Sequence, residues 1–261
     1  MLPVAIVRRT SAALQDGLTS HIARVPVDTG LARRQHEAYC AALADAGYEL
    51  RHVEDAPGLG DAVYVEDTVV VVDDVAVLSR PGAVERRPEV DGTEAVVHDL
   101  GLTVHRIEEP GTLDGGDVLQ VGSRVYVGRG GRTNAAGIAQ LRDILAPLGR
   151  TVVPVRLTEV LHLKSAVTAL PDDTLLLLPE LLEPGALPTG RPVEEEPGCH
   201  VVPLVDGTVL ISSSAPKTIQ ALEDLGFRTR PVDISEFEKR EGCVTCLSVL
   251  VHARSGAPAS A

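Results

Sequence analysis

Residues that could do chemistry stand near the starts of successive predicted strands. They are Asp67, Asp114, His162, the Cys199-His200 pair and Cys246, separated by 47, 48, 38 and 46 residues. If similar units are arranged around an axis, the starts of these strands converge on that axis. The carboxylates, a histidine and a cysteine would then share one central cavity.

These residue types together indicate one kind of chemistry. A thiol beside an imidazole suits covalent catalysis, because the thiolate attacks and the imidazole moves the proton. Several carboxylates nearby would repel an anion but suit a delocalised cation, and guanidinium matches carboxylates by paired hydrogen bonds. Arginines elsewhere in the cavity would suit an α-carboxylate. The set therefore indicates an arginine-like substrate that is attacked at its guanidinium carbon.

Each of these residues also has a structural interpretation. Most cysteines in cytosolic chains are small buried hydrophobic residues, so Cys246 could simply pack in the core. His162 stands between Leu161 and Leu163 and could be a core histidine. The sequence Asp-Gly-Gly at Asp114 is typical of a turn.

A zinc-stabilised binding protein is the alternative outside enzymology. Cys243 and Cys246 form a C-x-x-C pair, and Cys199 and His200 could supply two more ligands. This alternative predicts stoichiometric zinc and unfolding by a chelator.

A repeated pattern in the chain predicts the elements that position these residues. Four times, a Leu- or Ala-rich segment ends at a glycine, and an extended stretch ends six residues later. These glycines are Gly47, Gly101, Gly149 and Gly226. A glycine of this kind ends a helix in the left-handed conformation. The predicted helices are 31–46, 87–100, 133–148 and 216–225.

Hairpins are predicted between the helix–strand units. They comprise 69–72 with 75–79, 118–121 with 124–128, 166–170 with 175–178, and 201–204 with 208–212. A last strand, 246–251, is expected to pair with the N-terminal strand, and 184–197 reads as an insertion loop. We therefore expect an α/β fold of five quasi-repeats in one domain, residues 1–254, followed by a disordered tail, 255–261. A three-layer sandwich is disfavoured, because hairpins rather than single strands alternate with helices.

Composition excludes several classes of partner. The 261 residues carry a net charge of −13, which repels nucleic acid and anionic membranes, and the 2% aromatic content leaves little for base stacking. No apolar run approaches the length of about 18 residues that a membrane span needs. Four cysteines in a chain of this length do not make a disulfide scaffold, so a reducing cytoplasm is expected.

Several motifs in this sequence resemble the dimethylarginine dimethylaminohydrolases, members of the guanidine-modifying (pentein) superfamily. The matching segments are 16–19, 35–39, 64–68, 80–87, 112–119, 132–134, 161–165 and 244–248. The resemblance covers nearly the whole chain and implies a five-bladed α/β propeller, in agreement with the repeat pattern.

The resemblance also implies roles for particular residues. Cys246 would be the nucleophile, His162 the general acid and base, and Asp114 the group that binds the guanidinium and orients His162. Substrate contacts are implied for Leu18 on a lid, Asp61, Glu66, Asp67, Arg86, Arg132 and Glu241, with the two arginines at the carboxylate. Glu241 departs from the pattern, because relatives usually have Asp at that position.

The implied reaction converts a small guanidine substrate, methylated arginine, into citrulline and methylamine or dimethylamine. It requires no cofactor and no metal. The expected partners include neither nucleic acid nor membrane, and the chain would be a monomer or a homodimer. A related deiminase that releases ammonia from arginine is the first alternative, because an added methyl group changes binding by only ~1–3 kcal/mol.

Overall fold

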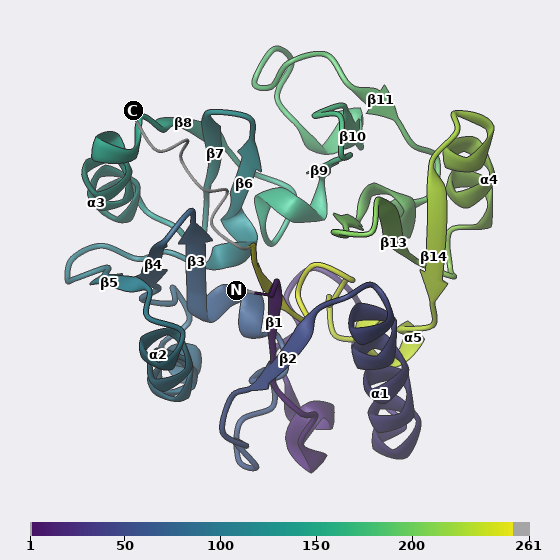
Figure 1. The fold of residues 1–261 in the computed structure, drawn as a ribbon, viewed down its shortest axis with the longest axis horizontal. Coiled ribbons are helices and arrows are strands. Elements are labelled where there is room, and N and C mark those ends of the chain that lie inside the picture. Colours follow the sequence, from purple (N-terminus) through teal and green to yellow (C-terminus); the bar gives the residue numbers. More distant parts are fainter. Residues whose placement is uncertain (1, 253–261) are drawn as a thin grey trace, which may run out of the picture.

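Five small sheets arranged in a ring make up the part of the chain that the structure describes (Figure 1). The structure is a computed structural model, and it describes residues 2–252. Each sheet has three strands, of which the middle strand pairs antiparallel with one neighbour and parallel with the other. The expected α/β propeller of five units is therefore confirmed.

The antiparallel pairs are β15 (Val249–Val251) with β1 (Val4–Val7), β3 (Val69–Val72) with β4 (Val75–Leu78), β6 (Val118–Val121) with β7 (Arg124–Arg129), β9 (Val167–Ala169) with β10 (Leu175–Leu177), and β12 (Val201–Pro203) with β13 (Thr208–Ser212). The strands parallel to the middle ones are β2 (Glu49–His52), β5 (Thr103–Arg106), β8 (Thr151–Arg156), β11 (Arg191–Pro192) and β14 (Arg228–Val232). The predicted pairing of the last strand with the first is confirmed, and it closes the ring.

Helices cover the outside of four of the five sheets (Figure 1). They are α1 (Thr29–Asp45), α2 (Val90–Asp99), α3 (Ala135–Leu145) and α4 (Pro216–Asp224), and a short α5 (Ser235–Glu238) precedes the last turn. The four helix-ending glycines have φ values of 100°, 70°, 69° and 89°, a conformation that costs glycine little. The sequence pattern thus placed these helix ends correctly.

Three predicted boundaries need correction. The stretch 184–197 is not simply an insertion, because β11 within it pairs with β10 and supplies the third strand of that sheet. The helix predicted from residue 87 begins as an α-helix at Val90, after a 3₁₀ segment that contains Pro88, which interrupts α-helical hydrogen bonding. The last strand begins at Val249 rather than Cys246. The predicted tail, 255–261, lies outside the described residues.

Apolar side chains hold neighbouring sheets together. For example, Ile6 of β1, Val71 of β3 and Leu78 of β4 are buried in one cluster. Burying such side chains stabilises the fold by about 1.5–3 kcal/mol each. Within residues 2–252, none of the helices is both long and apolar enough to cross a membrane.

Candidate active site

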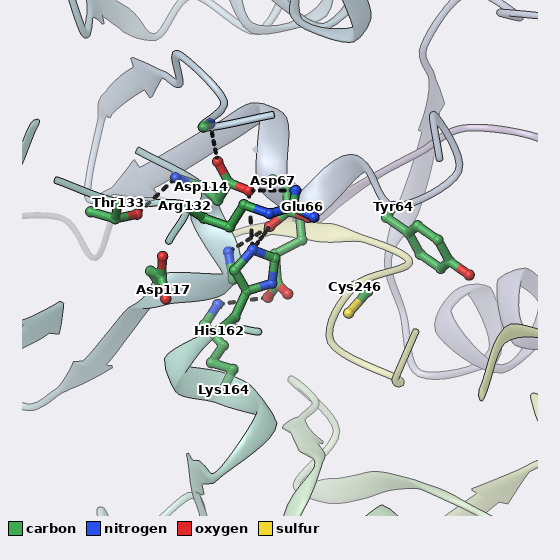
Figure 2. Close-up of polar contacts among 12 residues, drawn as sticks. Tyr64, Glu66, Asp67, Asp114, Asp117, Arg132, Thr133, His162, Lys164 and Cys246 are labelled. Carbon is green, nitrogen blue, oxygen red and sulfur yellow. Dashed lines mark hydrogen bonds and ion pairs between the residues drawn. The ribbon is translucent and has the colours of Figure 1, made fainter. Parts of the chain in front are cut away.

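The segments that lead into β3, β9 and β15 carry side chains into one pocket near the axis of the ring. Asp67 lies in a 3₁₀ turn before β3, His162 precedes β9, and Cys246 lies in the turn before β15. The cavity is about 20 Å³, and it is lined by Leu18, Asp61, Tyr64, Asp67, Arg86, Arg132, Leu161, His162, Arg240, Glu241 and Cys246. Figure 2 shows Cys246 across from His162.

His162 is held by carboxylates. Its Nε2 lies 3.0 Å from Oδ2 of Asp114 and 3.9 Å from Oδ1 of Asp67. Burial alone would lower the pKa of His162, but the charge of Asp67, the hydrogen bond with Asp114 and the charge of Asp117 together raise it to about 9. The imidazole therefore carries a proton at neutral pH.

Glycine is required beside this histidine. A Cβ atom at Gly116 would lie 2.7 Å from Nδ1 of His162 and 2.9 Å from Oδ1 of Asp67. The backbone N–H of Gly116 also donates to Asp67 Oδ1 at 2.8 Å. The Asp-Gly-Gly sequence is thus part of a turn, as its structural interpretation suggests. Its second glycine also lets the backbone lie close to the side chains of His162 and Asp67.

Asp114 joins the histidine to an arginine. It is fully buried, its Oδ1 accepts the backbone N–H of Gly82 at 2.9 Å, and its Oδ2 lies 3.6 Å from Nη1 of Arg132. The Nη1 atom of Arg132 is buried and has no hydrogen-bond partner within the described residues. Because unpaired buried donors cost free energy, this cation is suited to an anionic ligand group.

Arg86 differs from Arg132, because its guanidinium is already paired. Its Nη1 donates to Asp67 at 2.5 Å, its Nε and Nη2 donate to Glu89, and Nη2 also donates to the backbone carbonyls of Asp61 and Tyr64. Arg86 lines the pocket as predicted. Its implied contact with the substrate carboxylate stays a prediction, and the geometry favours Arg132 for that contact.

Cys246 lies in a tight turn with a second cysteine. Its backbone N–H donates to the carbonyl of Cys243 at 3.2 Å, and the two Sγ atoms are 3.2 Å apart. The hydrogen bond with Cys243, burial, and the charges of Glu66 and Asp67 all raise the pKa of Cys246. Because residues 243–246 form a turn, the extended backbone of β15 begins only after it, at Val249.

The segment 17–27 forms a flap over the pocket, without helix or strand. Asp61 accepts the backbone N–H of Leu18 at 2.9 Å. Glu241 accepts the backbone N–H groups of Ser20, His21 and Ile22. In this structure, two carboxylates that the resemblance assigns to the substrate hold the flap instead.

The guanidinium of Arg240 fastens the flap at a second place. It donates to the backbone carbonyl of Val25 in the flap at 2.9 Å, and to that of Gln15, just before the flap, at 3.0 Å. Both halves of the flap are therefore attached to the neighbouring residues Arg240 and Glu241.

Glu66 faces away from this pocket. It accepts from Nζ of Lys164 at 2.6 Å and from the hydroxyl of Thr245 at 2.9 Å. These three residues line a second cavity of about 740 Å³, bounded by β3, β6, β9, β12 and β15. Their chain neighbours Asp67 and Cys246 line the small pocket, so this cluster forms a partition between the two cavities.

The residues of the zinc alternative are not gathered into a site. The Cys199 thiol donates to the backbone carbonyl of Leu176, and His200 contacts the carbonyl of Ser165. In the part of the chain that the structure describes, the residues close enough to hold an ion are Asp67, Asp114 and His162. Cationic Arg86 and Arg132 lie against those carboxylates, which disfavours a metal there.

Sequence reasoning did not single out four residues of the site. Tyr64 and Leu161 line the pocket, and both stand inside segments that carry the resemblance. Lys164 lies two residues after His162, but its pairing with Glu66 spans 98 residues and leaves no signal in the sequence. Arg240 has no local motif, and its role depends on the flap.

No protein-family model matches the chain. It is 54% identical to the N(G),N(G)-dimethylarginine dimethylaminohydrolase of Streptomyces coelicolor, over 94% of this chain and 95% of that protein. It is 35% identical to the enzyme of the same name from Pseudomonas aeruginosa, over 94% and 98%. A structure of a Pseudomonas aeruginosa dimethylarginine dimethylaminohydrolase mutant with citrulline superimposes with a TM-score of 0.90, at 33% identity, covering 96% of this chain and all of that one.

Proposed function

Since this chain belongs to the dimethylarginine dimethylaminohydrolase family, we propose that it hydrolyses Nω-methylated arginine to citrulline and methylamine or dimethylamine. The observation that carries the proposal is the buried pairing of His162 with Asp114, in the same pocket as the thiol of Cys246. The comparisons name the reaction, and this arrangement supplies the groups that it needs.

Cys246 is the nucleophile in the proposed reaction, and His162 moves the protons. The Cys246 thiolate attacks the guanidinium carbon, and His162 gives its proton to the departing amine. Water then attacks the thiouronium intermediate while His162 accepts a proton. Collapse of the second tetrahedral species releases citrulline and returns the thiolate. Every group in these steps belongs to the chain, the substrate or water.

Substrate binding itself promotes formation of the nucleophile. In the free site, negative charge from Glu66 and Asp67 contributes to the raised pKa of Cys246. A guanidinium cation placed beside the sulfur opposes that charge and lowers the pKa of the thiol. His162 already carries a proton at neutral pH because its own pKa is raised to about 9. The acid and the nucleophile are therefore both available once the cation is bound.

The α-carboxylate of the substrate is assigned to Arg132, whose Nη1 has no hydrogen-bond partner within the described residues. The cavity of about 20 Å³ holds little more than one water molecule. Entry of an amino acid therefore requires the flap, 17–27, to move. Opening would free the carboxylates of Asp61 and Glu241 from the backbone of the flap.

The proposal extends to location and assembly. Cys40, Cys199, Cys243 and Cys246 are all free thiols, which fits a cytoplasmic, reducing environment. The assembly stays a prediction, a monomer or a homodimer. The partner is a small guanidine, and the net charge of −13 opposes binding to nucleic acid.

Product analysis on a panel of guanidines tests the proposal. The protein is incubated with arginine, monomethylarginine, asymmetric dimethylarginine and agmatine, and citrulline and the released amine are quantified. Cys246→Ser serves as the blank. We expect citrulline with dimethylamine or methylamine from the methylated substrates, and none from the variant. Ammonia from arginine would instead indicate a deiminase with the same site, and no turnover of any compound would overturn the assignment.

A further inference from the structure

The proposed reaction uses one of two cysteines that lie in contact. The Sγ atoms of Cys243 and Cys246 are 3.2 Å apart, and the backbone N–H of Cys243 points at the sulfur of Cys246 at 3.4 Å. The hydrogen bond from Cys246 N to Cys243 O closes a four-residue turn, which keeps the two Cα atoms within about 7 Å. Such a spacing is compatible with a disulfide.

Access to the two sulfurs is unequal. Cys246 is half-buried and lines the substrate pocket, whereas Cys243 is 8% exposed and does not line it. A small oxidant that enters the pocket therefore meets Cys246 first. Cys243 lies behind it, in position to react with the product.

We propose that Cys243 is a resolving cysteine, which forms a reversible disulfide with Cys246 when hydrogen peroxide enters the pocket. The disulfide removes the nucleophile and so switches the enzyme off. Its effect on activity rests on the proposed function, but its formation does not.

The chemistry balances with peroxide as the oxidant. In the resting pair the proton lies on Cys246, so its thiol first passes that proton to the Cys243 thiolate, 3.2 Å away. The Cys246 thiolate attacks one peroxide oxygen, the O–O bond breaks, and the leaving hydroxide takes the proton from Cys243 to form water. The sulfur is oxidised by two electrons to a sulfenic acid. The Cys243 thiolate then attacks that sulfur, the S–S bond forms, and the S–O bond breaks with release of hydroxide, which takes a proton from the solvent to form a second water. A dithiol reverses the process by exchange.

The surroundings of Cys243 suit this role. The hydrogen bond with Cys246, the positive charge of His200 and the contact with the Thr245 hydroxyl outweigh burial and the negative charge of Glu66, and they lower the pKa of Cys243 to about 6. A thiolate is the form that attacks a sulfenic acid. The sulfurs need to approach by roughly 1.2 Å to reach the bond length of about 2.05 Å. By contrast, burial raises the pKa of Cys199, whose thiol donates to a backbone carbonyl.

Mass spectrometry of the unchanged chain tests the proposal directly. Trypsin releases residues 241–254 as one peptide that contains both cysteines. After peroxide treatment and thiol alkylation, we expect this peptide to lack two hydrogens and to carry no alkyl group. Dithiothreitol should restore both thiols and most of the activity. A peptide in which Cys243 remains fully alkylated after peroxide has inactivated the enzyme would overturn the proposal, whatever the substrate is.

Two variants sharpen the test. In Cys243→Ser, prolonged peroxide should carry Cys246 on to sulfinic acid, so that dithiothreitol recovers little activity. The matched control is Cys40→Ala, which removes a buried thiol in α1 and should recover like the unchanged chain. Equal recovery of Cys243→Ser and the unchanged chain would contradict the role of Cys243.

Discussion

Glu241 accepts the backbone N–H of Ser20 at 2.9 Å, although 221 residues separate the two in the chain. The same carboxylate accepts the N–H groups of His21 and Ile22. A residue that the family resemblance assigns to the substrate is therefore the main fastening of the flap in this structure. Glu241 has one methylene more than the Asp that the resemblance implies at this position, which lengthens the arm that reaches the flap.

Glu241→Gln should loosen the flap. Hydrogen bonds to a charged group contribute about 1.5–3 kcal/mol, and the amide replaces one acceptor oxygen by a donor that faces the backbone N–H groups. Hydrogen exchange of peptides covering residues 17–25 should therefore become about 10-fold faster. Glu238→Gln is the matched control, because Glu238 bonds to Ser212 and Ser214. Unchanged exchange in Glu241→Gln would contradict the fastening.

Asp114→Asn should move the pH dependence of the reaction. Asp114 supports the protonated form of His162 by its hydrogen bond and its charge, so the pKa of His162 should fall from about 9 toward 6.5. Because His162 must be protonated to act as the acid, the alkaline limb of kcat should shift to lower pH. The pH profile of kcat and the imidazole NMR titration both report this. An alkaline limb that stays in place would show that another group controls it.

Arg132→Met should weaken binding of substrates that have a carboxylate. Loss of charge-assisted hydrogen bonds predicts an increase in KM for methylated arginine of about 10-fold or more. Inhibition by agmatine, which has a guanidinium but no carboxylate, should change much less. An equal loss for both compounds would mean that Arg132 acts through Asp114 instead.

Arg86→Met should act on stability. The change leaves Asp67 and Glu89 buried without their cation, and breaking such a buried pair costs about 3–5 kcal/mol. Urea unfolding should show this loss, whereas Arg132→Met should unfold close to the unchanged protein. Similar stabilities for the two arginine variants would contradict the structural role of Arg86.

The sequence allowed prediction of the repeated elements, because their signals are local. A glycine at the end of each helix and a turn between the strands of each hairpin depend only on neighbouring residues, and Gly47 and Gly101 adopt the expected positive φ. The near-regular spacing of Asp67, Asp114 and His162 also predicted that they lie near one axis, because similar units repeat along the chain. These features follow from patterns that repeat along the chain.

The remaining features depend on contacts between distant segments. Arg86 and Arg132 look alike in sequence, yet one is fully paired and the other is not, because Glu89 and Asp67 surround only the first. The hold of Glu241 on the flap spans 221 residues and leaves no local pattern. The sequence also did not show which cavity the Glu66 side chain faces, since Glu66 and its neighbour Asp67 line different cavities.

The partition between the cavities offers a test of coupling between Glu66 and Lys164. Lys164→Met leaves the Glu66 carboxylate buried, with the Thr245 hydroxyl as its remaining side-chain donor among residues 2–252, so the free energy of unfolding should fall by about 3–5 kcal/mol. Glu66→Gln with Lys164→Met removes both charges and should recover a large part of that loss. Urea unfolding of the two single variants and the double variant gives the interaction energy. Additive losses would mean that the 2.6 Å contact between Lys164 and Glu66 contributes nothing to stability.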